Sequence, residues 1–128
     1  MRVKIRLKIY EFYLFLGFKA IHTEVCVYGR DIWYTNDKGI CWCFEQNKED
    51  NARYSYRLKE IVDAGWCLKT IHQVQNILLC LQQKYNPQTY CIFSNNCRNF
   101  SLDFLEKIQP TKREIGILTT YLNNILIS

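Results

Sequence analysis

Histidine is scarce in this chain: the 128 residues include only His22 and His72. A catalytic site that uses histidine as a base therefore has two candidates. Long apolar runs are also missing. The strongest one, FYLFLGF at residues 12–18, is far shorter than the roughly 20 residues that a membrane-spanning helix requires. We therefore expect no membrane span, and we expect this segment to pack within a core strand or loop.

The cysteine spacings of structural zinc sites are absent, although the chain has seven cysteines. Cys41 and Cys43 are spaced C-x-C, and no C-x-x-C or His-x-x-x-His partner exists, so we expect no metal and no cofactor. An odd number of cysteines cannot pair completely within one chain. The charged, strand-like N-terminal segment also lacks the apolar core of a secretory signal. We therefore expect free thiols and a reducing compartment, cytoplasmic and/or nuclear.

A strong excess of one charge is missing as well. The formal net charge is +5, and the basic residues are spread along the whole chain. From Arg2 to Lys8, basic side chains alternate with apolar ones. This period of two predicts a strand with one solvated face. The sequence therefore favours an ordinary strand surface over a nucleic-acid interface, and we expect no nucleic-acid partner.

The first half of the chain has the pattern of an antiparallel meander, with short extended runs separated by turn residues. The turns are expected at residues 29–31 and 35–39, and the polar stretch 45–53 has no apolar rhythm and is expected to be an exposed loop. A further short strand is expected at 89–93. The expected strands of the meander and its extension are residues 2–10, 22–28, 32–34, 40–44 and 54–62.

The second half has helical periodicity. Thr70 and Gln73 form a capping box that predicts a helix from residue 71 to about Tyr85. A second helix is expected from residue 97 to Pro110, capped by Asn95 or Asn96, and an amphipathic segment follows at 115–127. No internal repeat or low-complexity tract is present. The sequence therefore predicts a single α+β domain over residues 1–128, with an antiparallel sheet packed against helices.

Cys97 stands at the start of the second expected helix, in the stretch FSNNCRNFSLDFL at residues 93–105. Unpaired N–H groups and the helix dipole favour a thiolate at such a position, although a cysteine there can also serve as a small packing residue. A nucleophilic thiol needs a base. His72 has the position of a surface residue on the first helix. His22 opens a strand and shares one face with Glu24 and Cys26, so His22 is the stronger partner for Cys97.

Two motifs around these residues resemble those of the PPPDE family, the thiol peptidases with a circularly permuted papain fold. Even the opening VKIRLKIYEF is similar to the start of that family, so the resemblance covers roughly residues 3–108. The first motif comprises His22, Thr23, Val25, Val27, Tyr28, Gly29, Asp31, Tyr34, Gly39 and Ile40. The second comprises Tyr90, Ile92, Phe93, Asn96, Cys97, Phe100 and Leu105.

The resemblance implies a cysteine isopeptidase that removes ubiquitin or a ubiquitin-like modifier such as SUMO, since the family includes desumoylating and proposed deubiquitinating enzymes. Carried over by position, Cys97 would be the nucleophile and His22 the general base of a Cys–His dyad, with an acyl-thioester intermediate. The backbone N–H of Cys97 would donate to the oxyanion, and Asn96 and Tyr28 would support it. Asn96 has helix capping as an equally good role. The implied partners are conjugates of the modifier.

Three positions depart from the family pattern. Asn99 stands where the family often has histidine, which puts substrate contacts in doubt, and Asp31 stands where it often has glutamate. Glu24 occupies a position that is usually small or apolar. It either faces His22 and raises the pKa of that imidazole, or it is a solvated strand residue, which is the more ordinary expectation.

Two other functions stay open on this sequence. One is a thioesterase or acyltransferase (an S-deacylase), as in the related lecithin retinol acyltransferase-like group, although that group usually carries a further histidine near its first motif. The other is a non-catalytic binding relative. Relatives can also dimerise, so a homodimer is an option; Trp33, Trp42 and Trp66 could serve such a contact or belong to the core.

Overall fold

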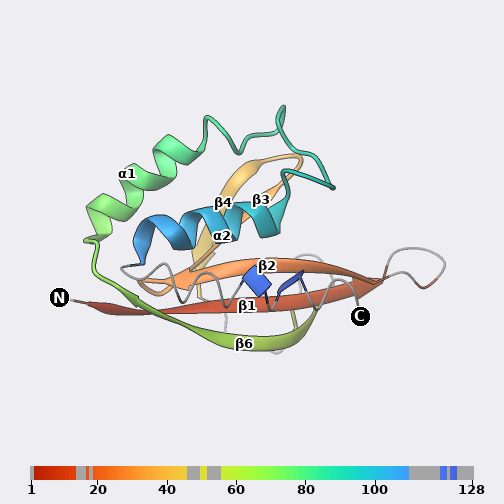
Figure 1. Cartoon of the computed structure of the whole chain (residues 1–128), viewed down its shortest axis with the longest axis horizontal. Helices are drawn as coiled ribbons and strands as arrows, with labels where there is room; N and C mark the ends of the chain where they lie inside the picture. The colour runs from red at the N-terminus through yellow and green to blue at the C-terminus, as the bar shows by residue number, and fades with distance from the viewer. Residues whose placement is uncertain are drawn as a thin grey trace.

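The computed structural model describes residues 2–13, 17, 19–45, 50–51, 56–109, 119–120 and 122–123. Within these ranges the chain is α+β, as predicted, with one antiparallel sheet in the order β4-β3-β2-β1-β6-β5 and two helices above it (Figure 1). The strands are β1 (Val3–Tyr13), β2 (Lys19–Val27), β3 (Arg30–Thr35), β4 (Gly39–Phe44), β5 (Asp50–Asn51) and β6 (Tyr56–Cys67). The helices are α1 (Ile71–Leu81) and α2 (Cys97–Ile108).

Alternation along β1 explains why α2 packs on one side of the sheet. Ile5, Leu7 and Ile9 point to the helix side and are fully buried, together with the apolar face of α2. Lys4 and Arg6 on the opposite side are at least partly exposed, as predicted for a solvated face. Lys8 is not: it is buried, because Asp31 of β3 lies 3.0 Å from its ammonium group. The prediction of a solvated strand face is therefore wrong at Lys8.

Tight turns join the strands of the meander. The β2–β3 turn consists of Tyr28 and Gly29, which both have positive φ angles, of 54° and 68°. Positive φ at both central residues is typical of the type I′ turn, whose twist suits a two-residue hairpin. The turn begins one residue earlier than predicted, and Tyr28 adopts a backbone conformation that is uncommon for a residue with a side chain.

Both predicted helices are present. The capping box of α1 forms as expected, with Gln73 N donating to Thr70 Oγ1 and Thr70 N donating to Gln73 Oε1. The helix ends at Leu81, earlier than predicted, and residues 82–84 form a turn. α2 begins at Cys97 with Asn96 as its N-cap. Its apolar face, comprising Phe100, Phe104, Leu105 and Ile108, is buried in the core.

Some expectations fail or lie elsewhere. The last strand continues to Cys67, past its predicted end at residue 62, and 89–93 is not a strand but a turn closed by an isolated bridge between Cys91 and Asn95. Of the expected loop 45–53, residues 46–49 and 52–53 lie outside the described residues, and 50–51 pair with β6 as β5. Trp33 is buried, whereas Trp42 and Trp66 are exposed.

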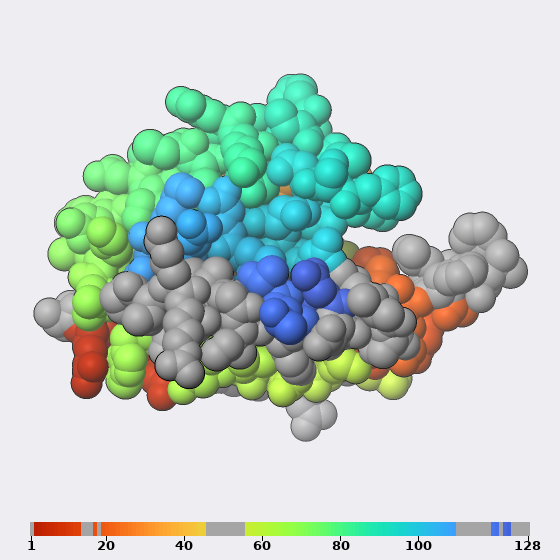
Figure 2. Space-filling view, viewed as in Figure 1, coloured from red at the N-terminus to blue at the C-terminus, as the bar shows by residue number. Residues whose placement is uncertain are grey.

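The C-terminal amphipathic segment lies mostly outside the described residues. Residues 119–120 and 122–123 are helical, and Leu122 is fully buried in the same core cluster as α2. Figure 2 shows these four residues, in dark blue, below α2. Among the described helices, none combines the length and the hydrophobicity needed to cross a membrane.

Candidate active site

The site lies where the edge of β2 meets the N-terminus of α2. β2 pairs with β1 along eight residues but with β3 at only three, Val25 to Val27. The β2 residues before Val25 therefore do not pair with β3, and the N-terminus of α2 lies against this edge of β2. The thiol of Cys97 lies 3.7 Å from the carbonyl oxygen of Ile21, to which it can donate. This contact places Cys97 beside Ile21 and the following residue, His22, and both Cys97 and His22 line one cavity.

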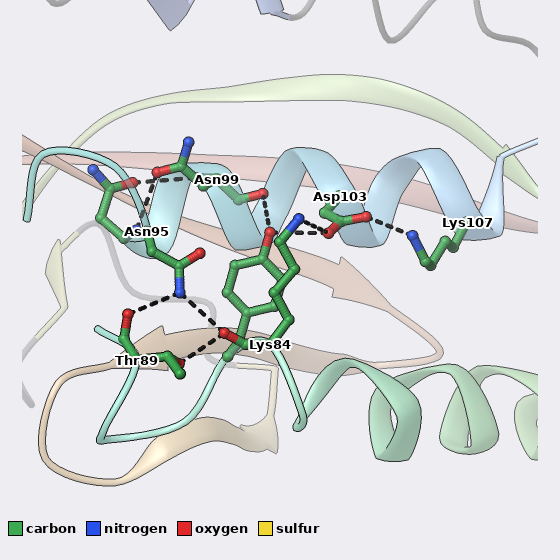
Figure 3. Close-up of polar contacts among 8 residues, drawn as sticks. Lys84, Thr89, Asn95, Asn99, Asp103 and Lys107 are labelled. Atoms are coloured by element: carbon green, nitrogen blue, oxygen red, sulfur yellow. Dashed lines mark hydrogen bonds and ion pairs between the residues drawn. The ribbon is translucent and has the colours of Figure 1, made fainter. Parts of the chain in front are cut away.

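A network of polar contacts holds the loop that leads into α2 (Figure 3). The side-chain amide of Asn95 donates to the carbonyl oxygens of Lys84 and Thr89, at 3.0 Å each. Tyr85 donates to Asp103 of α2 at 2.9 Å. The Asn95 contacts join the two ends of the 84–95 segment to each other, and the Tyr85 contact ties its start to α2, so the backbone before Cys97 is held in place.

Asn96 and Asn99 form a reciprocal capping box at the start of α2. Asn96 Oδ1 accepts from the backbone N–H groups of Arg98 and Asn99, at 3.0 and 3.2 Å. Asn99 Oδ1 accepts from the backbone N–H of Asn96 at 3.0 Å. Asn99, the departure from the family's histidine, thus has a structural role here: it completes the cap.

His22 contacts two chemically different partners. Its Nε2 atom lies 2.8 Å from Oε2 of Glu24. The second partner is the thiol of Cys97, which lines the same cavity and interacts with the ring closely enough for each group to shift the pKa of the other. Since Glu24 occupies Nε2, Nδ1 is the ring nitrogen that can serve the sulfur. Tyr10 and Tyr56 flank the imidazole, with ring centroids 5.9 and 4.8 Å away. The ring is thereby held in one orientation.

The electrostatics of this pair favour an ion pair. Burial by itself lowers the pKa of His22, but the hydrogen bonds and charges of Cys97 and Glu24 outweigh it and raise the pKa to about 9. Burial by itself raises the pKa of the Cys97 thiol. His22, together with the backbone N–H groups of Thr23 and Arg98, outweighs that effect and holds the pKa below its usual range. An imidazolium beside a thiolate is the result.

A cavity of about 460 Å³ opens onto both side chains. Cys97 is only 8% exposed, yet it lines this cavity, so a substrate can reach the sulfur there. Aromatic and aliphatic side chains make up about half of the wall. Lys19 and Arg98 add positive charge, and Asp37 adds a negative one. The apolar lining residues include Phe12, Tyr34, Tyr56, Tyr90 and Ile92.

A comparison with protein families decides what kind of domain carries this site. The model described as "PPPDE putative peptidase domain" matches residues 3–120, most of the chain. The chain belongs to the PPPDE peptidase family. A comparison with curated proteins found no matching sequence. The predicted family is therefore confirmed, and the domain is a peptidase-type domain.

Within this PPPDE domain, the structure brings together three of the four predicted site residues: Cys97, His22 and Asn96. It does not bring in Tyr28, which lies in the β2–β3 turn and donates its hydroxyl to the carbonyl oxygen of Lys69 at 2.7 Å. A supporting role for Tyr28 at the oxyanion is incompatible with this position. His72 is exposed on α1, away from the cavity.

Glu24 is the residue whose environment sequence reasoning misjudged. The ordinary expectation was a solvated strand residue, but Glu24 is 0% exposed and contacts His22. The sequence did contain a signal for this contact: His22 and Glu24 are two residues apart on β2, a spacing that places both side chains on one face of the strand. Cys26, two residues further, lies beside the guanidinium of Arg6, and burial raises its pKa to about 12, so it stays a thiol. Among the described residues, no group of three or more His, Cys, Asp or Glu side chains could hold a metal ion.

Proposed function

We propose that this PPPDE domain is a cysteine isopeptidase that cleaves ubiquitin or a ubiquitin-like modifier such as SUMO from proteins, with Cys97 as nucleophile and His22 as general acid and base. The observation that carries the proposal is that His22 and Cys97 line the same cavity at the start of α2, where their interaction raises the pKa of the imidazole and lowers that of the thiol. Family membership supports the peptidase class.

The acylation step uses the resting ion pair. The thiolate of Cys97 attacks the isopeptide carbonyl carbon, a C–S bond forms, and the carbonyl π electrons move onto oxygen. N–H groups in the first turn of a helix have no partner within the helix, so the backbone N–H of Cys97 is suited to stabilise this oxyanion. When the C–N bond breaks, the His22 imidazolium gives its proton to the leaving lysine amine.

Deacylation reverses the proton's path. Neutral His22 takes a proton from water as the water oxygen attacks the thioester carbon. The new tetrahedral centre then loses the C–S bond, which regenerates the thiolate beside the imidazolium and releases the modifier as a carboxylic acid that gives its remaining proton to solvent. Every proton that leaves His22 in the first half returns in the second, so no co-reactant besides water is needed.

The surroundings of the dyad suit a peptide substrate. A volume of about 460 Å³ is within the range of ligand-binding clefts, and aromatic walls offer large apolar contact areas to an extended chain. We further propose that the enzyme works in a reducing compartment, cytoplasmic and/or nuclear, because the nucleophile must stay a free thiol. Its partners would be modifier conjugates.

The test compares mechanism-based probes on the whole chain. At least one of the ubiquitin and SUMO vinyl sulfones should label the wild type and the Cys91→Ser control, while Cys97→Ser should stay unlabelled. The labelled peptide should contain Cys97. His22→Ala should slow labelling by about 10²- to 10⁴-fold, the usual contribution of a general base.

Two results would overturn the isopeptidase proposal. If both modifier probes fail but a fluorogenic acyl thioester is hydrolysed with dependence on Cys97, the protein is an S-deacylase or acyltransferase on this fold. If neither substrate reacts with the folded protein, the domain is a non-catalytic binding relative.

A further inference from the structure

We propose that Glu24 is a positioning residue that turns the Cys97–His22 pair into a three-residue site, by holding Nε2 of the imidazole so that Nδ1 faces the sulfur. The inference rests on the proposed function for its catalytic meaning, but its structural content concerns only His22. Glu24 acts through the imidazole and does not touch the reacting atoms.

The local geometry of β2 creates the contact. Residues two apart in a strand point to the same face, so His22 and Glu24 stand side by side, and their Nε2 and Oε2 atoms lie 2.8 Å apart. The imidazole is 4% exposed and the carboxylate 0%. A charge-assisted hydrogen bond of this length, removed from water, is among the stronger polar contacts in proteins.

The neighbouring strands keep this contact in place. Tyr10 of β1 pairs with His22 across the sheet, and the ring of Tyr56 of β6 also contacts the imidazole, with ring centroids 4.8 Å apart. Lys8 is the cross-strand partner of Glu24, and its ammonium group lies 3.0 Å from Asp31. Among the described residues, titratable groups that contact the imidazole include Glu24 from β2, Cys97 from α2, Tyr10 from β1 and Tyr56 from β6. Lys19, Asp37, Tyr90 and Arg98 line the same cavity.

The consequence for the chemistry is threefold. The carboxylate accepts a hydrogen bond from Nε2–H, which selects the tautomer in which neutral His22 presents the lone pair of Nδ1 to the thiol. It stabilises the imidazolium of the resting ion pair. It also stops the ring from rotating away when the C–N bond breaks, so that the proton reaches the leaving amine.

The experiment replaces Glu24→Gln and compares it with Glu60→Gln, a matched change at an exposed position of β6 in the same sheet. Both are made in a His72→Gln background, where His22 is the only histidine and its NMR signals need no further assignment. We expect Glu24→Gln to lower the pKa of His22 by roughly 1–3 units, the effect of losing an adjacent opposite charge. The Glu60→Gln variant should keep the background value.

A second measurement follows the thiolate. The alkylation rate of Cys97 by iodoacetamide, quantified by peptide mass spectrometry across pH, should be lower near neutral pH in Glu24→Gln than in Glu60→Gln, because a weakened imidazolium stabilises less thiolate. Glu24→Asp keeps the charge but shortens the reach, so it should restore part of the His22 pKa. A merely structural role for Glu24 would change the unfolding midpoint without moving either titration.

Two outcomes overturn the proposal. One is a folded Glu24→Gln variant in which His22 titrates as in Glu60→Gln. The other is measured on the protein with Glu24 intact, so it does not depend on whether the variant folds. If ¹⁵N shifts place the proton of the neutral His22 imidazole on Nδ1, Glu24 does not hold Nε2–H as proposed. If the modifier probes fail while Glu24→Gln still shifts the His22 titration, the isopeptidase function falls and the three-residue site stands. If the modifier probes label the protein with Glu24 and the Glu24→Gln variant equally, and the His22 titration is unmoved, the three-residue site falls and the isopeptidase function stands.

Discussion

The hydroxyl of Thr23 donates a hydrogen bond to the carbonyl oxygen of Cys97 across 3.2 Å. The residue that follows His22 on β2 thus holds the backbone of the proposed nucleophile on α2. Thr23 Oγ1 also lies 2.8 Å from Ser101 Oγ, one turn further along the helix. Since one hydroxyl has one proton to donate, Ser101 is the donor in that second contact. The distance between the two members of the dyad depends on this junction.

Thr23→Val tests the junction. The substitution keeps the volume but leaves the carbonyl of Cys97 and the hydroxyl of Ser101 without their partner in a buried site. We expect the free energy of unfolding to fall by roughly 1–3 kcal/mol, and the alkylation rate of Cys97 at pH 7 to fall because the thiol moves relative to His22. Urea unfolding and peptide-resolved alkylation measure the two effects. Thr23→Ser, which keeps the hydroxyl, should retain the alkylation rate; an equal loss in both variants would contradict this role.

The pH dependence of activity follows from the two shifted groups. His22 has its pKa raised to about 9, so its protonated form, which donates to the leaving amine, persists up to that pH and is lost above it. The pKa of Cys97 is lowered, so its thiolate persists below the usual range and is lost only as the pH falls through that lowered value. We expect a bell-shaped profile of kcat/KM with its alkaline limb near pH 9. An alkaline limb near 6.5, the ordinary histidine value, would refute the ion pair.

Substitutions at Asn96 separate helix capping from electrostatics. Asn96→Ala removes the acceptor for the N–H groups of Arg98 and Asn99 and should cost about 1 kcal/mol of stability. Asn96→Asp keeps the cap and suits the helix dipole, but it places a negative charge beside Cys97. The pKa of the thiol should therefore rise and alkylation at pH 7 should slow, with stability nearly unchanged. Asn96→Ser, a neutral cap, is the control; if it slows alkylation as much as Asn96→Asp, the charge is not the cause.

The buried ion pair of Lys8 and Asp31 should matter more for folding than the exposed pair of Lys4 and Asp63. Both have nitrogen–oxygen distances near 3 Å, of 3.0 and 2.8 Å respectively. Lys8→Met leaves the buried carboxylate of Asp31 without this cation and should cost about 3–5 kcal/mol. Lys4→Met should cost at most about 1 kcal/mol, because water screens the exposed pair. Urea denaturation of the two variants measures the difference, and similar losses would show that burial of Lys8 is not important.

Periodicity and capping signals predicted much of this fold. The alternation of β1, the Thr70–Gln73 capping box and the asparagine before Cys97 are local patterns, and each specifies a strand or a helix start whatever packs around it. The prediction of a strand at 89–93 was wrong because contacts with other parts of the chain, not the local pattern, decide the backbone there. Its residues have strand-like side chains, but the backbone is closed into a turn by the Cys91–Asn95 bridge, and Asn95 is held by the carbonyl oxygens of Lys84 and Thr89.

The sequence by itself determined the strand–helix order, the position of Cys97 at a helix start and the motifs that place the chain in its family. Only the tertiary structure decided that Glu24 is buried against His22, that Lys8 is paired with Asp31 inside the molecule and that Tyr28 lies apart from the cavity. The physical reason is that a period of two states which side chains share a face of a strand. Such a period does not show what covers that face. Burial depends on residues that are distant in the chain and come together only when α2 packs against the sheet.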